Sequence, residues 1–150
     1  MPQLFPFPAA PWYDERMIDL SSANRRKLEE LAQSFSLELL LLFGSRVTGK
    51  THKESDDDIG YFSSRKLDLD EEGRLINGLL PVAGERDERK INLINIRCAT
   101  PLLLYAMTAS CQVLYEKEDT AFARLRSYAF KKYLETRPLY EEKARRLQSE

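Results

Sequence analysis

The chain has 150 residues, and its 23 lysines and arginines nearly balance its 24 aspartates and glutamates, which gives a formal net charge of -1. This length suits one domain with a single core, and the absence of a basic surplus argues against direct binding of nucleic acid. No segment approaches the roughly 20 apolar residues that a membrane-spanning helix requires.

The first twenty residues predict an N-terminal arm that precedes a single domain over residues 21–150. Four prolines break the first eleven residues, so this stretch lacks the uninterrupted apolar core of a signal peptide. The two cysteines, Cys98 and Cys111, have no metal-ligand spacing, which favours free thiols in a reducing compartment. We therefore expect a cytoplasmic protein.

The next elements lead to the first motif. Ser21 or Ser22 can cap a helix over about residues 24–34. The apolar run Leu37–Phe43 predicts a buried strand, and a glycine at its end lets the backbone turn sharply toward a ligand. The turn is expected to present amides and positive side chains to phosphate groups. The predicted nucleotide-binding residues are Gly44, Ser45, Arg46, Lys50 and Ser55.

Two carboxylates on the following strand form the second motif. In the run from Asp56 to Phe62, the strand period of two sends Asp56 and Asp58 to one face and Asp57 to the other. Like charges so close together repel each other unless a cation lies between them. Mg²⁺ takes carboxylate and phosphate oxygens together, so the two motifs jointly predict a metal-bound triphosphate.

The remaining elements alternate between helix and strand. A helix from about residue 70 is expected to end at Pro81 and Gly84, and residues 91–96 predict a strand beside the aspartate strand. A helix over 100–110 and a short strand over 112–116 follow. A long helix over 120–148 is expected to be interrupted near Pro138. Its core-facing stripe is predicted to be Phe122, Leu125, Tyr128, Ala129 and Tyr133.

Gly44-Ser45, a spacer of ten residues and then Asp56-x-Asp58 resemble the signature of the minimal nucleotidyltransferases, a group within the DNA polymerase β-like superfamily. The segments 90–96, 99–103 and 112–116 are similar to the closing part of that family. The resemblance implies an α/β (α+β) fold of the polymerase β palm type. Such a fold has a small mixed sheet of about four strands, flanking helices and, in this chain, a long C-terminal helix.

The resemblance also implies a function. Small proteins of this group are commonly antitoxins of HEPN-domain ribonucleases, and they transfer AMP from ATP to a tyrosine of that toxin with the help of Mg²⁺. Carried over to this chain, the metal ligands are Asp56 and Asp58, and the catalytic group adds Asn92. The expected partners are ATP and a HEPN-domain toxin.

Asn92 departs from the family, which usually has a third carboxylate at this position. An amide can coordinate a metal through its oxygen, but it brings no charge and cannot take a proton from an attacking hydroxyl. Asp87 and Glu88, just before the strand, are the candidates for a substitute acid. Two alternatives therefore stay open: an inactive relative that neutralises the toxin by binding, and a less favoured small-molecule nucleotidyltransferase.

Overall fold

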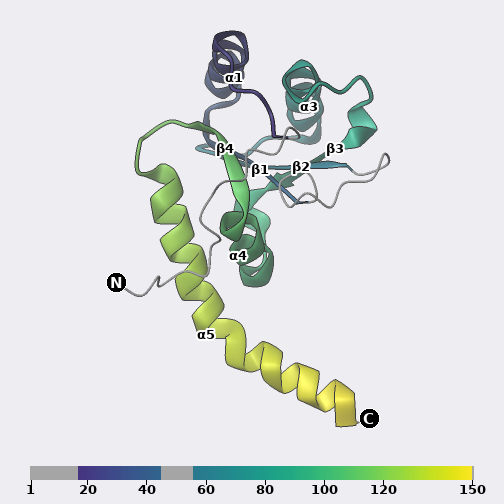
Figure 1. The fold of residues 1–150 in the computed structure, drawn as a ribbon, viewed down its shortest axis with the longest axis vertical. Helices are drawn as coiled ribbons and strands as arrows, with labels where there is room; N and C mark the ends of the chain where they lie inside the picture. Colours follow the sequence, from purple (N-terminus) through teal and green to yellow (C-terminus); the bar gives the residue numbers. More distant parts are fainter. Residues whose placement is uncertain (1–16, 45–55, 150) are drawn as a thin grey trace.

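The computed structural model describes residues 17–44 and 56–149. Figure 1 shows a sheet with helices on both sides and one long helix that extends beyond it. Along the chain, the elements are α1 (Ser22–Phe35), β1 (Leu37–Phe43), β2 (Asp57–Ser63), α3 (Leu69–Ala83), the 3-10 turn η1 (Glu88–Lys90), β3 (Ile91–Asn95), the 3-10 turn η2 (Ile96–Cys98), α4 (Pro101–Ala109), β4 (Cys111–Glu116) and α5 (Ala121–Ser149).

The strands form one mixed sheet in the order β3-β2-β1-β4. β1 pairs antiparallel with both β2 and β4, whereas β2 and β3 run parallel. A parallel pair needs a crossover connection, and α3 provides it between β2 and β3. The predicted small mixed sheet of four strands with flanking helices is confirmed.

The central strand β1 is covered on both faces, which explains its continuous apolar sequence. Leu40 and Leu42 pack into the core beneath α1 and α3, and Leu39 and Leu41 pack into a second core beneath α4 and α5. Figure 1 shows the two helix pairs on opposite sides of the sheet. The end of this strand is therefore held firmly in place, and the candidate site begins there.

The helix boundaries follow from capping residues. Ser21 caps α1, since its side chain accepts a hydrogen bond from the Asn24 amide at 3.3 Å. The expectation that Pro81 ends α3 is wrong, because the helix continues to Ala83. Pro81 lacks a backbone donor, but Val82 and Ala83 after it are buried in the core, which favours continuation of the helix. The other predicted end, Gly84, is confirmed, and its φ of 73° is the left-handed conformation typical of a C-cap.

The long helix α5 also differs from the prediction. It continues through Pro138 as one helix of 29 residues, and its axis changes direction in the second half (Figure 1). A proline can bend a helix without ending it. Tyr128 is 53% exposed and does not belong to the core, whereas Ala129 is buried and Tyr133 stacks on Tyr105 at 4.1 Å between ring centroids.

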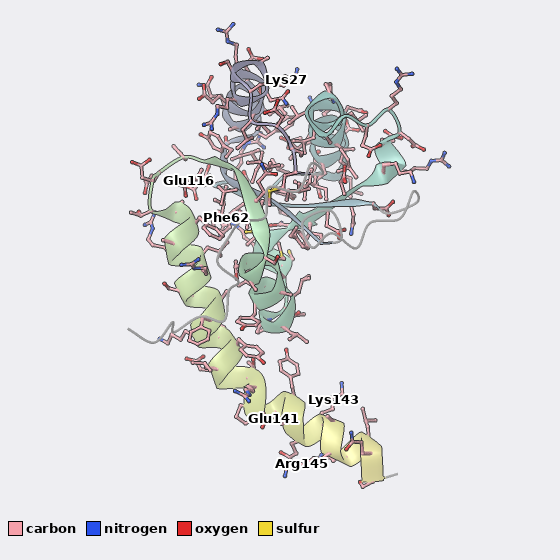
Figure 2. The ribbon with its side chains drawn as sticks, viewed as in Figure 1. Lys27, Phe62, Glu116, Glu141, Lys143 and Arg145 are labelled. Atoms are coloured by element: carbon pink, nitrogen blue, oxygen red, sulfur yellow. The ribbon has the colours of Figure 1, made fainter. Side chains whose placement is uncertain are left out.

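The second half of α5 stands clear of the sheet. Figure 2 shows Glu141, Lys143 and Arg145 on this part of the helix, away from the packed domain. Leu139 and Leu147 are two-thirds exposed there. Among the described residues, no helix is both long enough and apolar enough to cross a membrane.

Two glycines in α3 provide a test of the packing between α1 and α3. We expect Gly73→Ala to raise the free energy of unfolding by about 0.5–1 kcal/mol, because alanine is the better helix former and nothing lies within 4 Å of the new methyl group. Gly78→Ala is not expected to raise the free energy of unfolding, since its methyl group would collide with the buried Leu31 side chain. Urea unfolding of both variants measures the difference, and equal gains would contradict the described contact.

Candidate functional site

Three chain segments meet at one corner of the sheet. Gly44 follows the last residue of β1, Asp58 lies near the beginning of β2, and Asn92 lies near the beginning of β3. The strand register aligns them, because Phe43 is opposite Asp58 in the antiparallel pair and Asp58 is opposite Asn92 in the parallel pair. Residues far apart in sequence are thus brought together by the rigid sheet.

Gly44 approaches Asp58 so closely that a side chain at position 44 would displace the Asp58 carboxylate. Its φ is 86°, a conformation that side chains disfavour, and a Cβ atom at this position would collide with Oδ2 of Asp58. The sequence predicted a glycine turn toward a ligand. The structure adds that the glycine backbone lies directly against one oxygen of the candidate metal ligand.

The other carboxylate oxygen of Asp58 has a different neighbour. Oδ1 accepts a hydrogen bond from Nδ2 of Asn92 at 3.0 Å. Partial burial raises the pKa of Asp58 above its usual value, the Asn92 hydrogen bond lowers it in part, and the negative charge of Asp56 raises it further. The ionised form of Asp58 is therefore disfavoured in the free protein, and a bound cation would stabilise it.

The two flanking aspartates lie as the strand period predicts. Asp57 is buried, 4% exposed, on the face that carries the core residues Ile59 and Tyr61. Asp56 is exposed just before β2, near enough for its charge to act on Asp58. Asp56 and Asp58 are therefore available to a ligand, whereas Asp57 belongs to the interior.

The remaining predicted nucleotide-binding residues, namely Ser45, Arg46, Lys50 and Ser55, lie outside the described residues. The predicted substitutes for a third carboxylate do lie inside them. Asp87 holds Arg89 through two hydrogen bonds to the guanidinium, at 3.2 and 3.1 Å, and Glu88 is exposed in η1. Asn95 caps η2 by accepting from the Arg97 amide.

The donor set of the corner fits a hard divalent cation. Within residues 17–44 and 56–149, no group of three Asp, Glu, His or Cys side chains could hold a metal ion. A site made of protein ligands alone is therefore not found there. Mg²⁺ is typically bound by one or two carboxylates together with substrate phosphates, and Asp56 and Asp58 beside the Gly44 turn match that arrangement.

A cavity of about 560 Å³ lies at the opposite end of the sheet. Leu39 and Phe62 line it, and these residues pair with each other at the end of β1 and β2 remote from Gly44. Arg97 stacks over the Phe62 ring at 4.2 Å and donates two hydrogen bonds to the Ser63 carbonyl. The sequence does not predict this cavity, because its lining comes from separate elements with no shared motif.

The comparison with protein families matches most of the chain. The sequence model described as polymerase beta, nucleotidyltransferase, matches residues 26–120. This range includes all of the residues at the corner. Among curated proteins, no match is found.

Solved structures with the same fold come from toxin–antitoxin complexes. A chain of a toxin–antitoxin with AMP-PNP is 20% identical, with a TM-score of 0.67 over 83% of this chain and 98% of that one. A chain of the MntA–HepT toxin–antitoxin is 17% identical, with a TM-score of 0.62 over 85% and 99%. A third belongs to a tri-AMPylated Shewanella oneidensis HEPN toxin in complex with an MNT antitoxin. It is 21% identical, with a TM-score of 0.51 over 80% and 95%.

Proposed function

The chain belongs to the polymerase beta nucleotidyltransferase family, and we propose that it is an antitoxin that transfers AMP from ATP to a tyrosine of a HEPN-domain ribonuclease in the cytoplasm. The observation that carries this proposal is the corner at which Gly44 lies against the half-buried carboxylate of Asp58. The fold matches to chains of toxin–antitoxin complexes, one with AMP-PNP and one with an AMPylated toxin, support the choice of nucleotide and partner.

Each of the predicted metal-binding and nucleotide-binding residues has a chemical role in this proposal. Asp56 and Asp58 would hold Mg²⁺, and the turn at Gly44 and Ser45 would hold the triphosphate through backbone amides. Arg46 and Lys50 add positive charge, and the hydroxyl of Ser55 adds a donor. When bound, Mg²⁺ supplies charge neutralisation along the triphosphate.

The reaction is a single displacement at phosphorus. The tyrosine oxygen forms a bond to the α-phosphorus of ATP, the bond from that phosphorus to the bridging oxygen of the β-phosphate breaks, and pyrophosphate leaves. The proton of the hydroxyl passes to solvent. The site accelerates this step by holding the reactants in line and by stabilising charge, since little covalent chemistry is left for the protein.

A tyrosine acceptor suits a site without a carboxylate at position 92. A phenol has an unperturbed pKa of about 10, so it gives up its proton more easily than an alkyl hydroxyl. The amide of Asn92 cannot accept that proton. The chemistry of the corner therefore favours an acidic hydroxyl as the acceptor over an ordinary alcohol.

The test is transfer of label to the partner. The full chain is incubated with Mg²⁺, a HEPN-domain protein as the candidate partner, and ATP labelled either at the α-phosphate or at the γ-phosphate. We expect the partner to gain the α-label only, on a tyrosine, with loss of its ribonuclease activity. Absence of the α-label from a partner that is nonetheless inhibited would sink the enzymatic proposal.

Neutralisation by binding alone is the second candidate, and Asn92 is the observation that favours it. A site that has lost one of its three carboxylates can still bind a nucleotide or a partner protein without catalysing the transfer. The distinguishing experiment expresses the toxin with the double variant Asp56→Ala, Asp58→Ala. If cells that express the toxin and this variant still grow, neutralisation by binding alone is supported. If they stop growing although the variant still forms a complex with the toxin, AMP transfer is supported.

A further inference from the structure

The two oxygens of Asp58 face different neighbours, and this difference bears on how many metal ions the site can hold. Oδ2 lies against the backbone of Gly44, on the side where the proposed function places the triphosphate. Oδ1 accepts the hydrogen bond from Nδ2 of Asn92. An ion shared with phosphate at the glycine turn would be bound through Oδ2 and would leave Oδ1 in its hydrogen bond with Asn92.

The amide occupies the side of Asp58 that a second ion needs. Sites with two metal ions hold them about 3.5–4 Å apart, and two dications so close together need anionic ligands around them. An ionised carboxylate can only accept hydrogen bonds, so Asn92 must turn its NH₂ group toward it. The hydrogens of that group carry partial positive charge and repel a cation at Oδ1.

The sheet fixes this contact. Asp58 and Asn92 are directly opposite each other in the parallel pair of β2 and β3, so neither backbone can shift without breaking the ladder. Within the described residues, no other acid completes a metal site: Asp87 is held by Arg89, and no group of three potential metal-binding side chains is found there.

We infer that Asn92 is a positioning residue that limits the site to one divalent ion for each bound nucleotide. It does so by holding Oδ1 of Asp58 in a hydrogen bond, which leaves Oδ2 and the exposed Asp56 for a single ion. The inference rests on the proposed nucleotide site, but it concerns the number of ions and not the transfer of AMP.

Counting bound Mn²⁺ tests the inference directly. The full chain is titrated with Mn²⁺ in the presence of an ATP analogue that has a methylene bridge between its α- and β-phosphates, and free Mn²⁺ is measured by electron paramagnetic resonance. We expect one Mn²⁺ per bound nucleotide for the wild type and two for Asn92→Asp. The matched control is Asn95→Asp, the same change on the same strand, and it is expected to bind one.

A second readout requires no nucleotide. Asn92→Asp places two carboxylates within hydrogen-bond distance, where they repel each other. We expect the unfolding temperature of the metal-free protein to fall by several degrees for this variant and to be restored by Mn²⁺. The wild type and Asn95→Asp are expected to respond much less to the metal.

Two Mn²⁺ ions in the wild type, or a single ion in Asn92→Asp with unchanged metal-free unfolding, would overturn the inference. Absence of nucleotide-dependent Mn²⁺ binding in all three proteins would overturn it as well. The first two outcomes are distinct from a failure of the proposed function, whereas the last would contradict that function as well. Both readouts use the chain alone, whereas that function is decided by label on the HEPN partner.

Discussion

Asp58→Asn is expected to lower the rate of AMP transfer by about 10²–10³-fold or more, the loss typical when one preorganised electrostatic contact is removed from an active site. Asp58 lies between Gly44 on one side and Asn92 on the other, so its charge is central to the corner. Initial rates of incorporation of α-labelled AMP, at saturating ATP and Mg²⁺, measure the effect. Glu30→Gln, an exposed acid on α1, is the control and should keep full activity.

The same substitution should not destabilise the metal-free protein. The pKa of Asp58 is raised in the fold, first by burial, so this group stabilises the fold fully only below its ordinary pKa of 3.8. That contribution is lost as the pH rises through the folded pKa. At neutral pH in EDTA, the unfolding midpoint of Asp58→Asn is therefore expected to equal or exceed that of the wild type. A large drop in this midpoint would show that lost activity reflects lost folding.

Gly44→Ala is the second large expected effect. The substitution strains a backbone with a φ of 86° and drives the new methyl group into the Asp58 carboxylate. We expect a loss of stability greater than about 1 kcal/mol, since a left-handed conformation alone costs a side chain about 1–2 kcal/mol. Binding of the methylene-bridged ATP analogue should weaken at least about tenfold, equivalent to about 1.4 kcal/mol.

Gly84→Ala separates the two causes. Gly84 also has a positive φ, 73°, but nothing lies within 4 Å of the position of its Cβ atom. Because of backbone strain, this variant is expected to have a lower free energy of unfolding in urea. It is expected to bind the ATP analogue as tightly as the wild type does. Equal losses of affinity in both variants would mean that the contact between Gly44 and Asp58 does not organise the site.

Local sequence predicted the parts of the site that depend on local physics. The first strand matches its predicted bounds, Leu37–Phe43, because an apolar run that ends in glycine leaves few alternatives. The alternation of Asp56, Asp57 and Asp58 followed from the geometry of a strand. The placement of the third strand beside the second was also correct.

Contacts between distant elements could not be predicted in this way. The hydrogen bond between Asn92 and Asp58 depends on the register of two parallel strands, and a shift of one residue would turn the amide to the other face. The exposure of Tyr128 depends on how α5 lies on the sheet, which its helical spacing does not specify. The continuation of α3 past Pro81 depends on the cap at Gly84 and on the packing of Val82 and Ala83 in the core.

The pairing of β1 with both β2 and β4 has a consequence for the order of folding. β2 begins 14 residues after the end of β1, whereas the β4 partner of Phe43, Cys111, lies 68 residues after it in the chain. Closing the longer loop costs more chain entropy, and contacts distant in sequence form slowly. During synthesis, β1 and β2 can therefore pair and bring Gly44 beside Asp58 before β4 has left the ribosome. The pairing of β1 with β4 forms later.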